Sequence, residues 1–471
     1  MADVELVIRG GTVVTADARM VADIGVAEGV IVQIGGDLRA SRELDATGKL
    51  VLPGGVDAHV HLSTPPDGAA EPGETTAPRW VDDFTSGSAA ALAGGITTLG
   101  NMTFPAEGER PLAALAREET AVRAQAIADI FLHPVIADAT PETLDEIPRL
   151  PDVGCASIKI FMVAPDFDAH AADYCQAIRR ADSAGLLTLL HCEDHALIQD
   201  ATERLMASGR ADVRHYDEAC PIVSEVVAVQ RAVAIAEATG APIYIVHLSS
   251  ARALDACTEA QARGLPVYVE TRPLYLHLTR ERLREPDGAK YIGQPPLRER
   301  SDIEALWAGL RQGTIHTVCT DHAPWSLAAK LDPDLTVANA RPGVENLQTL
   351  RPMLYSEGVR TGRISLERFV ALTATNAARL FGLYPRKGTI AVGGDADLVV
   401  FDPELTRTVD RAMLKSNADY SVYEGWTVTG WPVVTIRRGE EVFRDGAILG
   451  AAGSGTLLRP RLGGRRAPLA L

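Results

Sequence analysis

The sequence has few lysines, no closely paired cysteines and no surplus of positive charge. Only six of its 46 basic residues are lysine, and its formal net charge is −16 at pH 7. This acidic balance argues against nucleic acid as the main partner, because phosphate binding requires a basic surface. The six cysteines are scattered without a C-x-x-C pair. That arrangement favours free thiols in a reducing compartment over a disulfide framework.

The chain also shows no segment typical of membrane targeting. The start, M-A-D-V-E-L-V-I-R-G-G, has no basic region followed by an apolar stretch. No apolar run reaches the length expected of a membrane span. We therefore expect a cytoplasmic protein with neither a membrane nor nucleic acid as partner. A length of 471 residues with 46% hydrophobic and 23% charged residues is typical of a globular protein. That length suggests roughly two or three domains.

Both ends of the chain alternate short apolar runs with glycine turns. Residues 3–50 and 387–450 show the period-2 pattern of antiparallel strands. We predict that they combine into one small β-sandwich domain, residues 1–52 plus 384–453, with a larger domain inserted between them. Residues 454–471 are predicted to form a C-terminal tail. Its basic residues favour a solvated end or a subunit contact; they are Arg459, Arg461, Arg465 and Arg466.

The middle of the chain alternates apolar strand-like runs with helical patterns. Eight strands are predicted, at residues 50–62, 96–102, 129–136, 156–163, 186–191, 242–248, 266–271 and 315–320. Helices are predicted at 171–184, 224–239, 251–263 and 301–311. A last helix is predicted at 365–383, with Ser365 as its N-cap. This alternation indicates an α/β fold, a parallel (β/α)8 TIM barrel over residues 53–383.

Six polar side chains stand at the ends of the predicted strands. They are His59 and His61 in V-D-A-H-V-H-L, Lys159 in S-I-K-I-F-M, His191 in L-L-H-C-E-D, His247 in I-V-H-L-S-S and Asp321 in V-C-T-D-H-A-P. Imidazole and carboxylate groups are the ligands of zinc and related divalent ions. The catalytic groups of a barrel gather at one rim, at the carboxyl ends of its strands. The pattern therefore predicts one metal site built from several strands.

Lys159 distinguishes between two interpretations of this cluster. Burial in an apolar strand lowers the pKa of an amine, so that the neutral form becomes accessible. A neutral amine can capture CO2 and become a carbamate, whose two oxygens can bridge two cations. The alternative is an ordinary ion pair with an acid such as Glu193 or Glu270. The four histidines and the aspartate on other strands favour the carbamate.

The six groups divide naturally between two metal ions. One ion would take His59, His61, Asp321 and one carbamate oxygen; the other would take His191, His247 and the second oxygen. A pair of divalent ions lowers the pKa of a bridging water and polarises a carbonyl group. Asp321 would accept the proton as the hydroxide attacks and pass it to the leaving nitrogen.

Four motifs resemble the amidohydrolase superfamily, in particular its branch of hydantoinases and dihydropyrimidinases. They are P-G-G-V-D-A-H-V-H-L (53–62), D-D-F-T-S-G-S-A-A-A-L-A-G-G-I-T-T (82–98), S-I-K-I-F-M (157–162) and L-F-G-L-Y-P-R-K-G-T-I-A-V-G-G-D-A-D-L-V-V-F-D-P (380–403). The resemblance implies two divalent ions, usually zinc (Zn2+), a carboxylated Lys159 and a homotetramer. It also implies that Asn339, in N-A-R-P-G-V-E-N, contacts the amide backbone of the substrate.

The sequence departs from hydantoinases at Ala164 and Arg272, and from other close relatives at Ser63. Ala164 stands where hydantoinases carry a Tyr that helps to polarise the scissile carbonyl. Ser63 stands where dihydroorotases and many allantoinases carry Arg. Arg272 replaces the usual Ser, Cys or Thr beside the substrate ring. We interpret Arg272 as a contact to an acidic or carbonyl-rich part of the substrate, and the alternative is an Arg bound to a neighbouring acid.

The leading interpretation is a metal-dependent hydrolase that opens the C–N bond of a cyclic amide or imide by attack of a metal-bridging hydroxide. A second enzyme interpretation is an allantoinase-like ureide amidohydrolase. A third is a non-catalytic assembly protein, like the dihydropyrimidinase-related proteins that keep the fold but lose ligands. All six ligand positions are filled here, which favours an enzyme.

Overall fold

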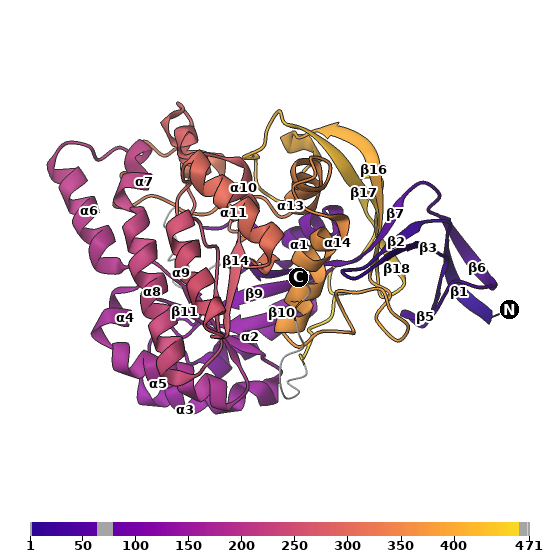
Figure 1. Ribbon diagram of the computed structural model, residues 1–471, viewed down its shortest axis with the longest axis horizontal. Helices are drawn as coiled ribbons and strands as arrows, with labels where there is room; N and C mark the ends of the chain where they lie inside the picture. Colours follow the sequence, from indigo (N-terminus) through magenta and orange to yellow (C-terminus); the bar gives the residue numbers. More distant parts are fainter. Residues whose placement is uncertain (1, 64–78, 461–468, 470–471) are drawn as a thin grey trace, which may run out of the picture.

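Parallel strands form the centre of the structure, with helices packed outside them (Figure 1). The computed structural model describes residues 2–63, 79–460 and 469. Most of the predicted tail beyond residue 460 therefore lies outside the described residues. The central strands are β8 (Gly55–Val60), β9 (Ile96–Thr103), β10 (Asp129–Pro134), β11 (Ser157–Phe161), β12 (Leu187–His191), β13 (Ile243–Ile245), β14 (Val267–Thr271) and β15 (Thr317–Val318).

Each of the eight predicted strand segments overlaps one of these strands. They pair in parallel within two groups, β8 to β10 and β11 to β15. Single parallel bridges, Val135–Lys159 and Val60–His322, connect the groups at both ends. The first predicted strand is in fact two, because the chain leaves β7 (Leu50–Pro53) and begins β8 after Gly54. A Cβ at Gly54 would lie 2.2 Å from the Thr97 hydroxyl, so this close approach requires glycine.

The helices follow the predicted pattern between the strands. The longer ones are α1 (Phe84–Ala93), α2 (Pro111–Gln125), α5 (Ala171–Ser183), α6 (His195–Ala207), α8 (Ile222–Thr239), α9 (Ala251–Ala262) and α11 (Arg300–Gln312). The shorter ones are α3 (Pro141–Glu146), α4 (Pro165–Ala169), α7 (Tyr216–Ala219), α10 (Pro273–His277), α12 (Leu327–Lys330), α13 (Leu350–Leu354), α14 (Leu366–Val370) and α15 (Asn376–Leu380). The predicted helix 365–383 begins as expected, since the Ser365 side chain accepts from the Arg368 N–H, but a π-helical turn interrupts it at Ala371–Thr375.

Helix α8 corrects one expectation. The segment Val213–Thr239 is long and apolar enough to cross a membrane by length and composition alone. In the structure α8 packs against α9 and buries Val226, Val229 and Val233. More than half of the most apolar stretch is buried inside the protein. An apolar helix covered on one side by the core of a globular protein accounts for this composition.

Two sheets beside the parallel strands draw on both ends of the chain. One contains β5 (Val30–Ile34), β4 (Ile24–Ala27), β1 (Ala2–Arg9) and β6 (Leu38–Asp45). The other runs in the order β19 (Ala447–Ile448), β18 (Glu440–Arg444), β17 (Thr427–Arg437), β16 (Leu398–Thr408), β7, β2 (Thr12–Val14) and β3 (Arg19–Val21). The antiparallel pairing of β7 with β16 joins the two chain ends. Figure 1 shows this region beside the helices and parallel strands.

A buried lysine connects this β region to the parallel strands. The Lys387 ammonium lies 2.6 Å from Asp129 on β10, and 2.9 and 2.7 Å from Asp395 and Asp397. All four side chains are buried. The three carboxylates are close enough together to hold a cation. In this structure the ammonium of Lys387 lies among them, and Arg438 and Arg386 pair with Asp129 and Asp395 from outside. The cluster is therefore an internal ion network between the two parts of the fold.

Candidate metal centre

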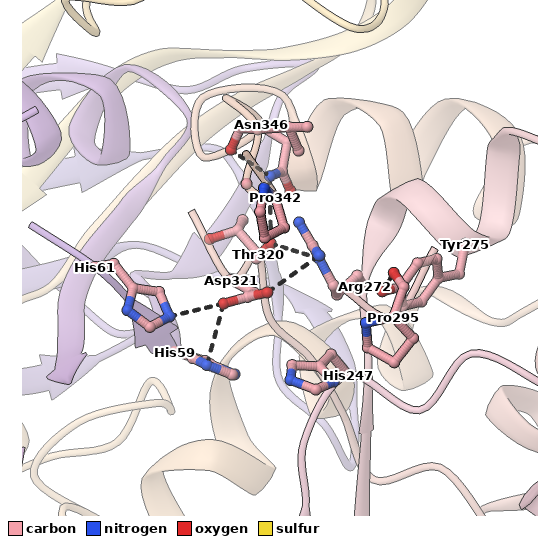
Figure 2. A network of polar contacts seen from close by, with 12 residues as sticks. His59, His61, His247, Arg272, Tyr275, Pro295, Thr320, Asp321, Pro342 and Asn346 are labelled. Atoms are coloured by element: carbon pink, nitrogen blue, oxygen red, sulfur yellow. Dashed lines mark hydrogen bonds and ion pairs between the residues drawn. The ribbon is translucent and has the colours of Figure 1, made fainter. Parts of the chain in front are cut away.

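The ends of β8 and β15 bring two histidines and an aspartate together. The Nε2 atoms of His59 and His61 lie 3.2 and 2.8 Å from the same oxygen, Oδ1 of Asp321. Figure 2 shows Asp321 between these two rings and Arg272. The three residues offer ligand atoms within 4.8 Å of one another. This is the spacing at which three side chains can share one metal ion.

The other two predicted histidines lie beside this group. The ring centres of His59 and His247 are 5.5 Å apart, and those of His247 and His191 are 4.5 Å apart. All four rings and Asp321 line a cavity of about 110 Å³. The described part of its wall is completed by Trp80, Phe161, Gln294, Ala323, Pro342 and Gly343. The strand ends therefore converge on one small, mainly apolar cavity.

Lys159 is completely buried next to this cavity. Its Nζ lies 4.7 Å from the centre of the Phe161 ring, and it has no hydrogen-bond partner in the part of the chain that the structure describes. Burial lowers the pKa of Lys159 to about 8, against the opposing effect of Asp321 and Glu270. The alternative ion pair with Glu193 or Glu270 is not formed among these residues. Both carboxylates are hydrogen-bonded to histidines instead.

Glu270 and Glu193 orient the imidazoles, a role that the sequence alone did not indicate. Oε1 of Glu270 lies 2.8 Å from Nδ1 of the His59 ring, and it accepts a hydrogen bond from the backbone N–H of His247 at 2.9 Å. Oε2 of Glu193 lies 2.8 Å from Nε2 of His191. A carboxylate on the far nitrogen fixes the orientation of a metal-binding imidazole and raises its basicity. The sequence feature that could have identified Glu193 and Glu270 was their position, since both lie at the ends of predicted strands.

The electrostatics keep these groups in the protonation states that bind metals. Burial lowers the pKa of His61 to about 4, and it lowers the pKa values of His191 and His247 as well. Burial alone would raise the pKa of Asp321, but the charge of Arg272 and the contacts with His59 and His61 hold it well below its usual value. Neutral imidazoles and an ionised carboxylate are the forms that coordinate a cation.

Two of these residues have an unusual backbone. His247 and Asp321 have φ values of +38° and +50°. Non-glycine residues are uncommon in this left-handed region, and such positions concentrate at functional sites. Both occur where the chain leaves a central strand and the side chain faces the cavity. The local strain is consistent with selection for the position of the side chain.

Several buried atoms around the cavity fit the presence of a cation. Nδ1 of His61, Nδ1 of His247, Nζ of Lys159 and Oε1 of Glu193 have no hydrogen-bond partner among the residues described. Buried polar atoms are rarely left unpaired in native proteins. The donor set of imidazole nitrogens and carboxylate oxygens is that of zinc and similar ions. The residues present therefore fit a divalent metal site.

Arg272 is placed differently from the prediction that it contacts the substrate. Its side chain is completely buried and is not part of the described cavity wall. Nη1 lies 3.1 Å from Oδ2 of Asp321, and Nε donates to the Thr320 carbonyl at 3.1 Å. The geometry supports the alternative, an Arg bound to a neighbouring acid. The physical reason is that the carboxylate lies directly beside the end of β14.

Asn339 and Ala164 also lie apart from the described cavity wall. Asn339 is exposed, and its Oδ1 accepts the Thr336 N–H at 2.6 Å within a local turn, so its placement does not support a substrate contact. Ala164 is the N-cap of α4. Asn346, at the other end of the same motif, is buried and donates to the Thr320 carbonyl at 3.2 Å (Figure 2). Sequence reasoning missed Asn346 and the cavity residues Trp80 and Gln294.

Comparison with known proteins gives the same picture over nearly the whole chain. The sequence profile of the Amidohydrolase family matches residues 50–442. D-phenylhydantoinase of Escherichia coli O1:K1 is 38% identical over 463 residues, which cover 96% of this chain and 98% of that protein.

Solved structures of hydantoinases and dihydropyrimidinases superpose closely on this fold. Dihydropyrimidinase from Brevibacillus agri has a TM-score of 0.91 at 35% identity, covering 98% of this chain and 99% of its own. L-hydantoinase from Arthrobacter aurescens has a TM-score of 0.88 at 31% identity, covering 97% and 100%. D-hydantoinase structures match equally well, one of them with a TM-score of 0.91 at 34% identity, covering 97% of this chain and 99% of that one. The overall fold therefore does not distinguish the two stereochemical preferences.

Proposed function

The chain belongs to the amidohydrolase family, and from this premise we propose that it is a metal-dependent hydrolase that opens a C–N bond of a cyclic amide or imide. One observation carries the proposal. Four imidazoles and a carboxylate, from four strand ends, line one cavity beside a buried lysine. They do so in a chain that matches D-phenylhydantoinase over 96% of its length.

The proposed architecture is a closed (β/α)8 barrel over residues 53–383. The single bridges at Val60 and Val135 support closure, since they link the two groups of parallel strands at both ends. Residues 1–52 and 384–453 would form the β-sandwich domain, and 454–471 the tail. A cytoplasmic homotetramer is the assembly that the family resemblance implies.

The metal centre would consist of His59, His61, Lys159, His191, His247 and Asp321, with Lys159 carboxylated by CO2. Two divalent ions, zinc in the usual case of this family, would be held there. Such ions polarise a carbonyl group and lower the pKa of water. The neutral amine that carboxylation requires is accessible because burial lowers the pKa of Lys159 to about 8.

Other side chains of the protein would orient the ligands, transfer the proton and bind the substrate. Glu270 and Glu193 orient the imidazoles, and Oδ1 of Asp321 would accept a proton and return it to the leaving nitrogen. The Gln294 amide lines the cavity and has no side-chain hydrogen bond in the described parts of the chain. An amide both donates and accepts, so Gln294 could bind the carbonyl and the N–H of a ring amide together.

Metal analysis tests the proposal directly. The purified protein should contain close to two divalent ions per chain, and Lys159→Ala should lose them. Lys290→Ala is the matched control, because the contacts of Lys290 are local: an ion pair with Asp287 at 2.6 Å and a contact with the Tyr291 ring at 4.9 Å. Wild-type protein that is folded and almost free of metal would favour the non-catalytic assembly protein instead.

A substrate panel then separates the two enzyme interpretations. Hydantoins, dihydrouracils, cyclic imides and allantoin would be compared by loss of ring absorbance and by product analysis. We expect turnover of cyclic amides or imides. Turnover of allantoin alone would support the ureide amidohydrolase, which stays a candidate because Ala164 replaces the family Tyr.

A further inference from the structure

The arginine at the end of β14, Arg272, contacts both Asp321 and the residue before it. Its Nη1 lies 3.1 Å from the carboxylate oxygen Oδ2, and its Nε donates at 3.1 Å to the carbonyl of Thr320, the residue before Asp321. Arg272 is therefore bound both to the side chain of Asp321 and to the peptide that leads into it. The contact of Nη1 with Asp321 is an ion pair, and neither Nη1 nor Nη2 has a hydrogen-bond partner in the described chain.

The backbone at this point needs such support. Asp321 has a φ of +50°, a conformation that non-glycine residues keep only when their surroundings hold it. Its N–H donates to the His59 carbonyl at 2.8 Å. The Thr320 carbonyl accepts from both Arg272 and Asn346, at 3.1 and 3.2 Å (Figure 2). The direction of the Asp321 side chain is thus fixed from several sides.

The two oxygens of Asp321 have different partners as a result. Oδ2 faces Arg272, whereas Oδ1 faces Nε2 of His59 and Nε2 of His61. The guanidinium occupies one side of the carboxylate, so only the other side is turned towards the histidines. A planar guanidinium can hold a carboxylate and a carbonyl in one fixed arrangement, which the single ammonium of a lysine cannot do as well.

We infer that Arg272 is a positioning residue for the metal centre, which binds Oδ2 of Asp321 and thereby turns Oδ1 towards His59 and His61. The inference rests on the proposed function. It replaces the interpretation of Arg272 as a substrate contact. Groups that orient a metal ligand from outside the coordination shell commonly change metal affinity by roughly ten- to hundredfold when they are removed.

The residues around Arg272 leave space for its guanidinium. A Cβ on Gly293 would lie 2.8 Å from Nη1 of Arg272, so glycine at this position leaves space for the guanidinium. On another side, Cζ lies 5.4 Å from the centre of the Tyr275 ring. Gln294, the residue after Gly293, lines the cavity. Arg272 therefore lies behind the cavity wall, where it can act on Asp321.

The test compares Arg272→Gln and Arg272→Lys with the wild type. Metal-free protein would be titrated with Zn2+ against a competing chelator, and the Co2+-substituted forms compared by their absorption spectra. We expect Arg272→Gln to bind metal at least tenfold more weakly, with an altered Co2+ spectrum. In the metal-saturated enzyme kcat should fall while KM changes little. Arg272→Lys should recover part of the affinity.

Arg351→Gln is the matched control. Arg351 is also completely buried and donates to the Gly95 carbonyl at 2.6 Å. It forms no ion pair within the described parts of the chain. Its replacement should lower stability without changing metal affinity or the Co2+ spectrum. An equal loss of affinity in both variants would overturn the inference, because it would reflect general destabilisation.

A second variant covers the case that Arg272→Gln does not fold. Gly293→Ala keeps Arg272 but pushes on its guanidinium, and it should weaken metal binding in the same direction. Wild-type affinity and spectrum in Gly293→Ala, or in a folded Arg272→Gln, would refute the positioning role. A raised KM for acidic substrates with unchanged metal binding would restore the substrate contact. Failure of the wild type itself to bind metal would instead refute the proposed function.

Discussion

Glu270 offers the sharpest single test of how the centre is organised. Its Oε1 accepts from Nδ1 of His59 and from the N–H of His247, at 2.8 and 2.9 Å, and its Oε2 accepts the Tyr244 hydroxyl at 2.8 Å. Glu270→Gln keeps one oxygen for the first two donors. Its new NH2 would face Tyr244, whose hydroxyl can donate instead to Thr317 Oγ1 at 2.6 Å. The hydrogen bonds can therefore survive while the negative charge is lost.

The expected effect is on metal binding rather than on folding. Removing the charge that raises the basicity of His59 should weaken metal affinity by roughly ten- to hundredfold, which is about 1.4 to 2.7 kcal/mol. Glu270→Ala would be less informative, because each buried donor left unpaired costs about 1 to 3 kcal/mol of stability. Chelator competition with Zn2+ measures the affinity, and circular dichroism with a thermal melt shows that the variant is folded.

Asp302→Asn provides the control for this measurement. Asp302 is a buried carboxylate that accepts two backbone N–H groups, from Ala251 and Glu299, at 2.9 and 3.1 Å. It is not part of the described cavity wall, so its replacement should leave metal affinity unchanged. If Glu270→Gln binds metal as tightly as the wild type, the orienting role of Glu270 is wrong.

Two further variants test other parts of the structure. Lys387→Met should lower stability by about 3 kcal/mol, because it removes the cation that three buried carboxylates share, although Asp129 and Asp395 keep ion pairs with Arg438 and Arg386. A thermal melt measures this, and an unchanged melt would contradict the role of the ion network. His277 is buried, and burial lowers its pKa to about 3, whereas in the unfolded chain the pKa is about 6.5. The unfolded state therefore gains a proton first as the pH falls, so the free energy of unfolding is highest above pH 6.5 and decreases between about pH 6.5 and 3. His277→Phe should remove about 2 kcal/mol of the loss at pH 5, and equal melting curves for both proteins at pH 5 and 7.5 would refute this.

Much of the fold could be predicted because its strands are buried on both faces. Continuous apolar runs such as A-P-I-Y-I-V-H-L indicate such strands, and no choice between a buried and an exposed face is needed. The polar residues that end these runs were then visible as exceptions to the pattern. His59, His191, His247 and Asp321 were found in this way, and all four line the cavity. Strand-end position was sufficient because parallel strands end at the same rim.

The sequence was least informative where the outcome depended on the direction of a side chain in a loop. Asn339 and Asn346 stand at opposite ends of one eight-residue motif, and the sequence does not show which of them turns inward. The structure buries Asn346 and leaves Asn339 exposed. Arg272 was correctly placed at a strand end, but its partner could not be chosen. That choice depends on a contact with Asp321, which lies 49 positions later and has a left-handed backbone.

The strand β14 shows why one strand end can have so much influence on the centre. Glu270 and Arg272 are two positions apart and therefore lie on the same side of the chain as it leaves the sheet. Glu270 contacts His59 at 2.8 Å, and Arg272 contacts Asp321 at 3.1 Å. Between them, Thr271 turns the other way and donates to the Leu248 carbonyl at 2.8 Å. A shift of this strand by one residue would exchange these sides and remove both supports together. The register of β14 thus sets the position of two proposed ligands that come from elsewhere in the chain.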